Sequence, residues 1–146
     1  SLFDHLTVVQ NVAYGLISKG MKKKEAIIMA SDFLKHFELN GFENRFPETL
    51  SGGEAQRVCL ARTLIMKPKL VLFDEPLSAL DAPLRKKLAK LIKTSQEKIG
   101  FTGIMVTHDL DEAKSIANKI ILMKKGEIVW SGNSSEFDEN FLTDLN

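Results

Sequence analysis

Several features that mark particular protein classes are missing from this 146-residue sequence. It holds one cysteine, Cys59, so no internal disulfide can form, and a reducing compartment is the natural setting. No apolar run approaches the roughly 18 residues that span a bilayer, and no secretory leader is visible. Neither sign of charge dominates, because 20 basic and 19 acidic residues leave a net charge of +1, which argues against a nucleic-acid partner.

The composition that remains is that of an ordinary globular domain. Hydrophobic residues make up 44% and charged residues 27% of a length that suits one domain. We expect a soluble chain, or one held at a membrane by a partner. Because the chain begins at Ser1 without an initiator methionine, we also expect further residues to precede it.

The first part of the chain, residues 1–49, is predicted to be a helical subdomain. Thr7 can cap a helix that runs to about Ser18, and a second helix is expected from Lys22 to Phe37. The apolar stripe of this second helix is predicted to consist of Ala26, Met29, Ala30, Phe33 and Phe37.

From residue 50 to residue 146, helices alternate with short apolar strands, which is typical of α/β proteins. Asp81 is the expected cap of the long helix between the first two strands, and Asp109 with Glu112 forms a capping box for the next helix. Residues 133–146 are predicted to form a final helix. The strands are expected at 69–73, 102–107, 119–123 and 127–130, with a tight turn at Lys125-Gly126 between the last two. Wholly apolar strands indicate a parallel sheet that is buried on both faces and flanked by helices.

A serine and two glycines stand at the start of the helix that follows residue 50. Ser51 can cap this helix and Glu54 completes a capping box, so a plain helix start explains the pattern. Two successive glycines, Gly52 and Gly53, are costly for a cap alone, and they favour the close approach of another group to the backbone. Free N–H groups, the positive end of the helix dipole and a hydroxyl form an anion site, most naturally for phosphate. Both interpretations stay open.

Two adjacent carboxylates follow one of the apolar strands. Asp74 and Glu75 come directly after Leu70–Phe73, at the end of the strand where ligands bind in open α/β sheets. Neighbouring like charges at the end of a buried strand cost free energy unless a cation or a proton is present. A hydrated Mg²⁺ bound to a nucleotide would satisfy one carboxylate, and the other could take a proton from an attacking water. The alternative is a surface turn with two solvated acids.

A single histidine, His108, follows the strand expected at 102–107. If this strand runs parallel to the strand before Asp74, His108 lies at the same end of the sheet as the two acids. A purely structural role at a strand end is the alternative. His5 and His36 lie in no such context and are given no role.

Taken in order, these motifs resemble those of ATP-binding-cassette (ABC) transporter ATPases. The matching stretches are the signature motif at Leu50–Glu54, the Walker B strand with the catalytic glutamate at Leu70–Glu75, the D-loop at Ser78–Asp81, the switch-histidine region at Val106–Asp109, and the start of an importer-type helical subdomain at Leu2–Val8. Glu54 stands where the family more often has glutamine. The resemblance extends to about Gly132. It implies the C-terminal part of a P-loop nucleotide-hydrolase core at residues 50–146, beside an α-helical subdomain at residues 1–49.

The resemblance implies that two subunits meet head to tail and hold two ATP molecules, each with Mg²⁺, between them. In that arrangement Asp74 would help to hold Mg²⁺, Glu75 would orient or deprotonate the attacking water, and His108 would contact the γ-phosphate. Residues 51–54 would contact the ATP that is held mainly by the opposite subunit. Asp81 would cross the dimer interface, and it can cap its own helix at the same time.

The resemblance also implies a transmembrane permease as partner, with the ATPase peripheral to the cytoplasmic face of the inner membrane. Phe3, Leu6 and Tyr14 are candidates for permease contact, although core packing explains each of them equally well. We therefore predict the ATP-binding subunit of an ABC importer, whose solute is chosen by other subunits. Two alternatives stay open: a soluble ABC ATPase outside transport, and a non-catalytic module that pairs with a complete subunit.

One motif of this family does not occur, because the sequence holds no G-x-x-x-x-G-K-[ST] phosphate loop. The family's phosphate loop and the glutamine of its Q-loop would both precede Ser1, since Gln10 lies inside the first predicted helix. We therefore expect these 146 residues alone neither to bind Mg-ATP with useful affinity nor to hydrolyse it. We also expect an unpaired sheet edge that favours swapping or self-association.

Overall fold

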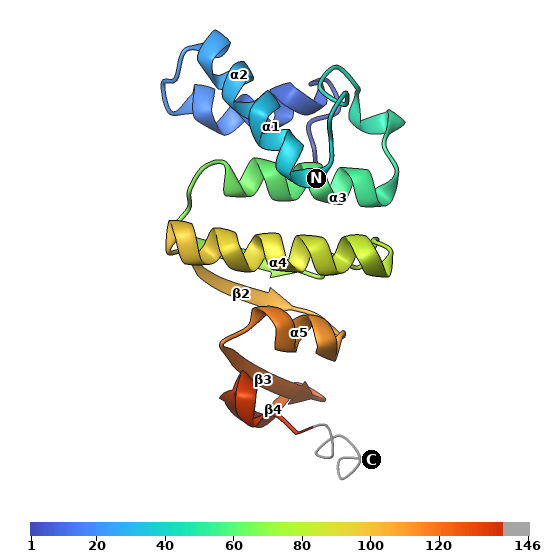
Figure 1. Cartoon of the computed structure of the whole chain (residues 1–146), viewed down its shortest axis with the longest axis vertical. Helices are drawn as coiled ribbons and strands as arrows, with labels where there is room; N and C mark the ends of the chain where they lie inside the picture. The colour runs from blue at the N-terminus through green and yellow to red at the C-terminus, as the bar shows by residue number, and fades with distance from the viewer. Residues whose placement is uncertain (139–146) are drawn as a thin grey trace. The chain divides into compact units, whose positions relative to one another are not determined.

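The computed structural model describes residues 1–138, which fall into two compact units (Figure 1). The first unit is Ser1–Val106, and the second begins at Thr107. The predicted division at residue 49 lies inside the first unit, and it stays a prediction about subdomains.

The first unit opens with helices that pack on one another. Thr7 caps the first of them, as predicted, and the cap is a full capping box. Its hydroxyl accepts a hydrogen bond from the N–H of Gln10, and the Gln10 side chain accepts one from the N–H of Thr7. The first helix contacts both of the other α-helices. In chain order the elements are α1 (Val8–Ser18), α2 (Lys23–Leu34), η1 (Lys35–Phe37), η2 (Pro47–Thr49) and α3 (Gly52–Leu64).

The second helix is shorter than the sequence predicts. α2 ends at Leu34, and the chain continues to Phe37 as a 3₁₀ turn. The predicted apolar stripe is right at Ala26, Ala30 and Phe37, which are buried, and wrong at Met29, which is 46% exposed. Leu34 extends the buried series instead, because residues four apart lie on one face of a helix.

A buried asparagine ties the start of the chain to α1. The side-chain oxygen of Asn11 accepts a hydrogen bond from the N–H of Phe3 at 2.8 Å. Its side-chain nitrogen lies 3.0 to 3.1 Å from the carbonyl oxygens of Phe3, Leu6 and Thr7. Asn11 therefore gives the backbone of residues 3–7 additional hydrogen-bond partners at the start of α1.

Two parallel strands joined by a long helix complete the first unit. Leu72 is paired with Ile104 in the register of the strands. Asp81 caps the helix by accepting a hydrogen bond from the N–H of Leu84 at 2.9 Å, and Gly100 ends it with a φ of 78°. The predicted strand–helix–strand order is confirmed. Its elements are β1 (Leu70–Asp74), α4 (Ala82–Ile99) and β2 (Thr102–Val106).

Within residues 1–138, only one face of this sheet is buried. Val71 and Phe73 point into the core, with exposed fractions of 3% and 7%. Four aliphatic side chains on the opposite face, which we call the open sheet face, are 55% to 71% exposed: Leu70, Leu72, Ile104 and Val106. The prediction of a sheet buried on both faces is therefore wrong for the described residues. The apolar strands have the composition of a sheet covered on both sides, but these residues provide one covering layer.

The second unit is a short helix followed by a hairpin. Asp109 caps the helix by accepting a hydrogen bond from the N–H of Glu112 at 3.0 Å, which confirms the cap and leaves the reciprocal half of the predicted capping box as a prediction. The hairpin turns through Lys125 and Gly126, both with positive φ, which suits a tight turn between antiparallel strands. The elements are α5 (Leu110–Ile116), β3 (Lys119–Lys124), β4 (Glu127–Asn133) and η3 (Ser134–Glu136).

The C-terminal end of this hairpin region differs from the sequence prediction. The last strand runs three residues beyond the expected end at Trp130. The helix predicted at 133–146 begins only as the 3₁₀ turn η3, and its later part lies outside the described residues. The ring of Phe137 meets the ring of Trp130 edge-on, with centroids 4.9 Å apart, so this contact follows directly after the turn.

Candidate functional site

The predicted capping box at the start of α3 is present. The hydroxyl of Ser51 accepts a hydrogen bond from the N–H of Glu54 at 3.3 Å, and the Glu54 carboxylate accepts one from the N–H of Ser51 at 2.8 Å. The bond from the Ser51 N–H lowers the pKa of the Glu54 carboxyl from its ordinary value of 4.5. The box does not use the amides of Gly52 and Gly53, which stand in the first turn of the helix. The cap interpretation is confirmed, and it leaves the phosphate interpretation as a prediction.

The structure identifies a group that approaches the glycines closely. A Cβ added to Gly53 would lie 3.0 Å from the carbonyl oxygen of Ala79 and 3.0 Å from a methyl of Leu80. At Gly52 the nearest atom would be the Ala79 side chain at 3.9 Å. The close approach that the sequence predicts therefore exists. Only a residue without a side chain fits at position 53, because the loop at residues 75–80 fills the space that a Cβ would occupy.

The two predicted acids lie at the carboxyl end of β1. Asp74 is the last residue of the strand, opposite Val106 of β2, and both acids are exposed. The N–H of Glu75 donates to the carbonyl oxygen of Val106 at 2.9 Å. Glu75 has a φ of 43°, in the left-handed region that side chains other than glycine rarely adopt. Backbone strain of this kind costs of order 1–3 kcal/mol and is concentrated at functional sites.

A glutamine that the sequence did not single out links this strained loop to α3. The side chain of Gln56 is hydrogen bonded to three residues of the loop after β1: Glu75, Ser78 and Ala79. These partners lie 19 to 23 positions along the chain, so no local pattern indicates the contact.

The remaining predicted residues are Asp81 and His108, and they lie in different units. Asp81 is the N-cap of α4, which confirms its local interpretation and leaves its role at a dimer interface as a prediction. His108 is exposed and lies in the second unit, two residues after β2. Its position relative to Asp74 and Glu75 stays a prediction.

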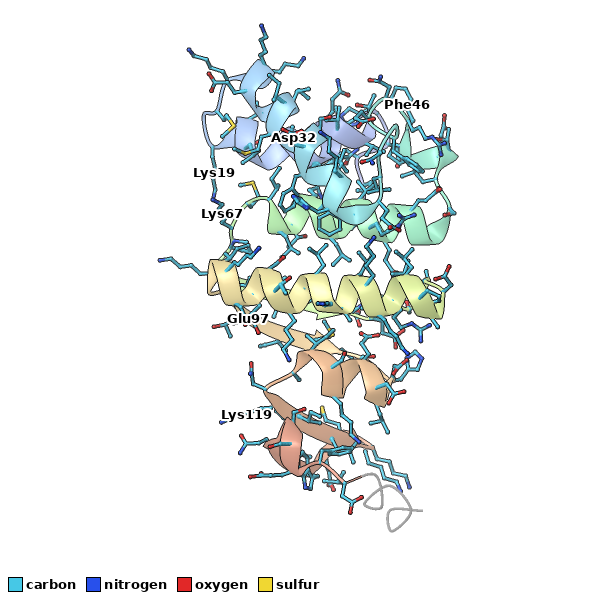
Figure 2. The ribbon with its side chains drawn as sticks, in the orientation of Figure 1. Lys19, Asp32, Phe46, Lys67, Glu97 and Lys119 are labelled. Carbon is cyan, nitrogen blue, oxygen red and sulfur yellow. The ribbon has the colours of Figure 1, made fainter. Side chains whose placement is uncertain are left out.

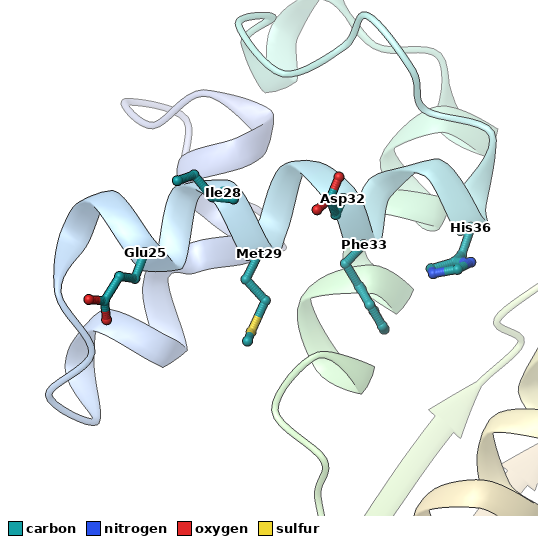
Figure 3. A pocket seen from close by; sticks show the side chains of 6 residues that line it. All are labelled: Glu25, Ile28, Met29, Asp32, Phe33 and His36. Carbon is teal, nitrogen blue, oxygen red and sulfur yellow. The ribbon is translucent and has the colours of Figure 1, made fainter.

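Residues 1–138 contain no group of three or more His, Cys, Asp or Glu side chains arranged to hold a metal ion. They do contain a hollow of about 480 Å³ along α2 and η1, and none of the predicted site residues lines it (Figure 3). Ile28, Met29 and Phe33 form its apolar lining, and Glu25, Asp32 and His36 complete it.

No helix in the described part of the chain has the length and apolar character needed to cross a membrane.

The fold and the order of these motifs define an α/β domain of the nucleotide-binding ATPase class. The model of the ABC transporter family matches residues 1–78, which is more than half of the chain. The chain therefore belongs to the ABC transporter family.

Similar proteins agree in fold and in family. The chain is 49% identical over 139 residues to the Fe(3+) ions import ATP-binding protein FbpC of Rhizobium etli, covering 95% of this chain and 39% of the relative. It is 43% identical over 136 residues to FbpC 1 of Haemophilus influenzae, covering 93% and 42%. Its structure is similar to the dimeric ATP-binding cassette MJ0796 in a post-hydrolysis state bound to ADP and Pi, with a TM-score of 0.85, 37% identity and coverage of 94% and 60%. The predicted α/β class is confirmed, and the chain spans about two fifths of the curated relatives' length.

Proposed function

We propose that this chain is the signature-bearing part of the ATP-binding subunit of an ABC importer. Such a subunit couples the binding and hydrolysis of ATP, in a head-to-tail dimer, to solute transport by a permease. The observation that supports this most strongly is Glu75, an exposed acid held in a left-handed backbone conformation at the carboxyl end of a parallel strand. The glycine turn at residues 51–53 packs against the loop that Glu75 begins.

In this proposal the acids act on one ATP and the glycine turn acts on another. Glu75 orients or deprotonates the attacking water, and His108 contacts the γ-phosphate. Residues 51–54 present a helix start, a hydroxyl and two glycine amides to the ATP of the opposite subunit, and Asp81 links the two sites. Phosphoryl transfer depends almost entirely on such positioning and charge stabilisation.

The residues present fit Mg²⁺ held mainly by a nucleotide. Asp74 offers a single exposed carboxylate at the end of β1, and the described residues form no protein cage around it. Mg²⁺ keeps several waters and binds one or two carboxylates together with substrate phosphates. Asp74 would hold the ion, which would neutralise charge on the phosphates.

The helical subdomain at residues 1–49 supplies the proposed contact with the permease, which would keep the subunit at the cytoplasmic face of the membrane. Phe3 and Tyr14 are 38% and 48% exposed, and their ring centroids lie 4.7 Å apart. A paired aromatic surface of this kind suits a protein interface. Because the relatives FbpC are named for Fe(3+) import, ferric iron is the first solute to test.

A complementation assay tests the proposal. The Rhizobium etli relative would be produced with the residue that aligns with Ser51 replaced by arginine, and mixed with this chain. We expect ATP turnover to rise roughly tenfold when the chain supplies an intact turn, because lost transition-state contacts of this type cost at least that factor. Ser51→Arg in this chain should abolish the rise, while Ser18→Arg, at an exposed position at the end of α1, should keep it. The proposal would be contradicted if turnover did not rise when the folded chain was added, or if Ser51→Arg gave the same rise as the wild type.

A further inference from the structure

Gln56, in the second turn of α3, binds the loop after β1 through both ends of its side-chain amide. Its nitrogen donates to the carbonyl oxygen of Glu75 at 3.0 Å and to the hydroxyl of Ser78 at 3.2 Å. Its oxygen accepts a hydrogen bond from the N–H of Ala79 at 3.2 Å. We call these interactions the Gln56 clasp. Only an amide side chain offers a donor and an acceptor in this arrangement, so the chemistry is specific to the residue.

The clasp completes the fixation of the strained Glu75 backbone. The N–H of Glu75 is held by the carbonyl of Val106 in β2, at 2.9 Å. Its carbonyl oxygen accepts hydrogen bonds from the amide of Gln56 and from the hydroxyl of Ser78, the latter at 3.0 Å. A residue other than glycine keeps a left-handed conformation only where several surrounding contacts fix it. Gln56 supplies one of these contacts, and it comes from a different element, α3.

The same helix meets the same loop at a second point. The contact of Gly53 with Ala79 and Leu80 leaves no space for a side chain, so the loop cannot shift toward α3 without displacing the first turn of the helix. The clasp prevents the opposite movement, away from α3. Together the two contacts join the loop after β1 to the turn at residues 51–53.

We propose that Gln56 is a positioning residue that sets the backbone of Glu75 and joins it to the glycine turn of the same chain. A change at either the acid or the turn is then transmitted to the other through the Gln56 clasp. The mechanical part of this inference depends on the structure alone. Its effect on turnover rests on the proposed function.

Amide hydrogen exchange on the 146-residue chain tests the mechanical part without any nucleotide. Gln56→Met keeps the size of the side chain and removes its polar partners, so exchange at the Ala79 amide should accelerate about tenfold. Gln96→Met is the matched control, because the Gln96 side chain also donates to a backbone carbonyl, that of Phe101, at 2.9 Å. The control should leave Ala79 unchanged. Equal exchange at Ala79 in the wild type and in Gln56→Met would overturn the inference.

A second variant separates the two ends of the amide. Gln56→Glu keeps an acceptor for the Ala79 N–H and loses the donor to Glu75, so Ala79 should stay protected. In the complementation assay this chain supplies only the glycine turn, because its own acids have no phosphate loop beside them. Both Gln56 variants should therefore lower kcat about tenfold through the turn, with the KM for Mg-ATP unchanged. Wild-type kcat in Gln56→Glu would overturn the link between the loop and the glycine turn. If the wild-type chain gives no complementation, the proposed function fails, and hydrogen exchange still decides the clasp.

Discussion

At the scale of single residues, the backbone conformation of Glu75 matters most for the proposed chemistry. Its carboxylate needs an exposed place at the end of β1, and the chain reaches this place by passing through a left-handed φ of 43°. An L-residue in this region costs roughly 1–2 kcal/mol, whereas glycine adopts it freely. Glu75 therefore combines a backbone suited to glycine with a side chain that only an acid provides.

We predict that Glu75→Gly is more stable than Glu75→Ala by about 1 kcal/mol, because both variants lose the carboxylate and only glycine relieves the backbone. Urea unfolding of the two variants measures the difference. The same pair at Glu97, an exposed residue within α4 (Figure 2), should show the opposite order by about 0.5–1 kcal/mol. An identical order at both positions would contradict the assignment of strain to Glu75.

Residue-level prediction from the sequence succeeds where the partners are local. Ser51 and Glu54 lie three positions apart, so their reciprocal bonds follow from the pattern alone. Gln56 could not be found in this way, because its partners reach it only after β1 has returned the chain to α3. Gly53 is an intermediate case: the sequence predicts a close approach, and the approaching atoms of Ala79 and Leu80 come from the fold.

The starts of the helices are the elements that the sequence predicts best. Thr7, Ser51, Asp81 and Asp109 each cap the helix assigned to them. The ends are less well predicted. α2 stops at Leu34, and the chain tightens into a 3₁₀ turn in which both Leu34 and Phe37 are buried. Capping depends on a few neighbouring groups, whereas the length of an element depends on what it packs against.

The cap of α3 should be sensitive to acid. The hydrogen bond from the Ser51 N–H lowers the pKa of Glu54 below 4.5 in the folded state, so the charged form stabilises the fold. This contribution is present above pH 4.5 and is lost as the pH falls through the lowered pKa. Glu54→Ala should therefore destabilise the chain at pH 7, and the difference from the wild type should shrink toward pH 3. Urea unfolding at each pH measures it, with Glu97→Ala as the control; a difference independent of pH would contradict this origin.

At the scale of the whole chain, the open sheet face is the largest departure from the predicted architecture. The sequence predicts strands covered on both sides, and this prediction requires a layer that residues 1–138 do not provide. Local patterns report that a strand is apolar on both faces, but not which segment covers each face. An uncovered apolar face and an unpaired sheet edge both favour attraction between copies of the chain.

We predict that the 146-residue chain self-associates through the open sheet face, where Leu72 is 71% exposed and lies beside Ile104. A second copy offers the same aliphatic surface, and burying the two surfaces together removes both from water. The average mass measured by light scattering should rise with protein concentration. Leu72→Lys should hold it near the monomer value, because a charge at the centre of the face opposes its burial. Ile28→Lys, at a position 57% exposed on α2, is the control and should leave the association intact. A wild-type chain that stays a monodisperse monomer at every concentration would refute the prediction.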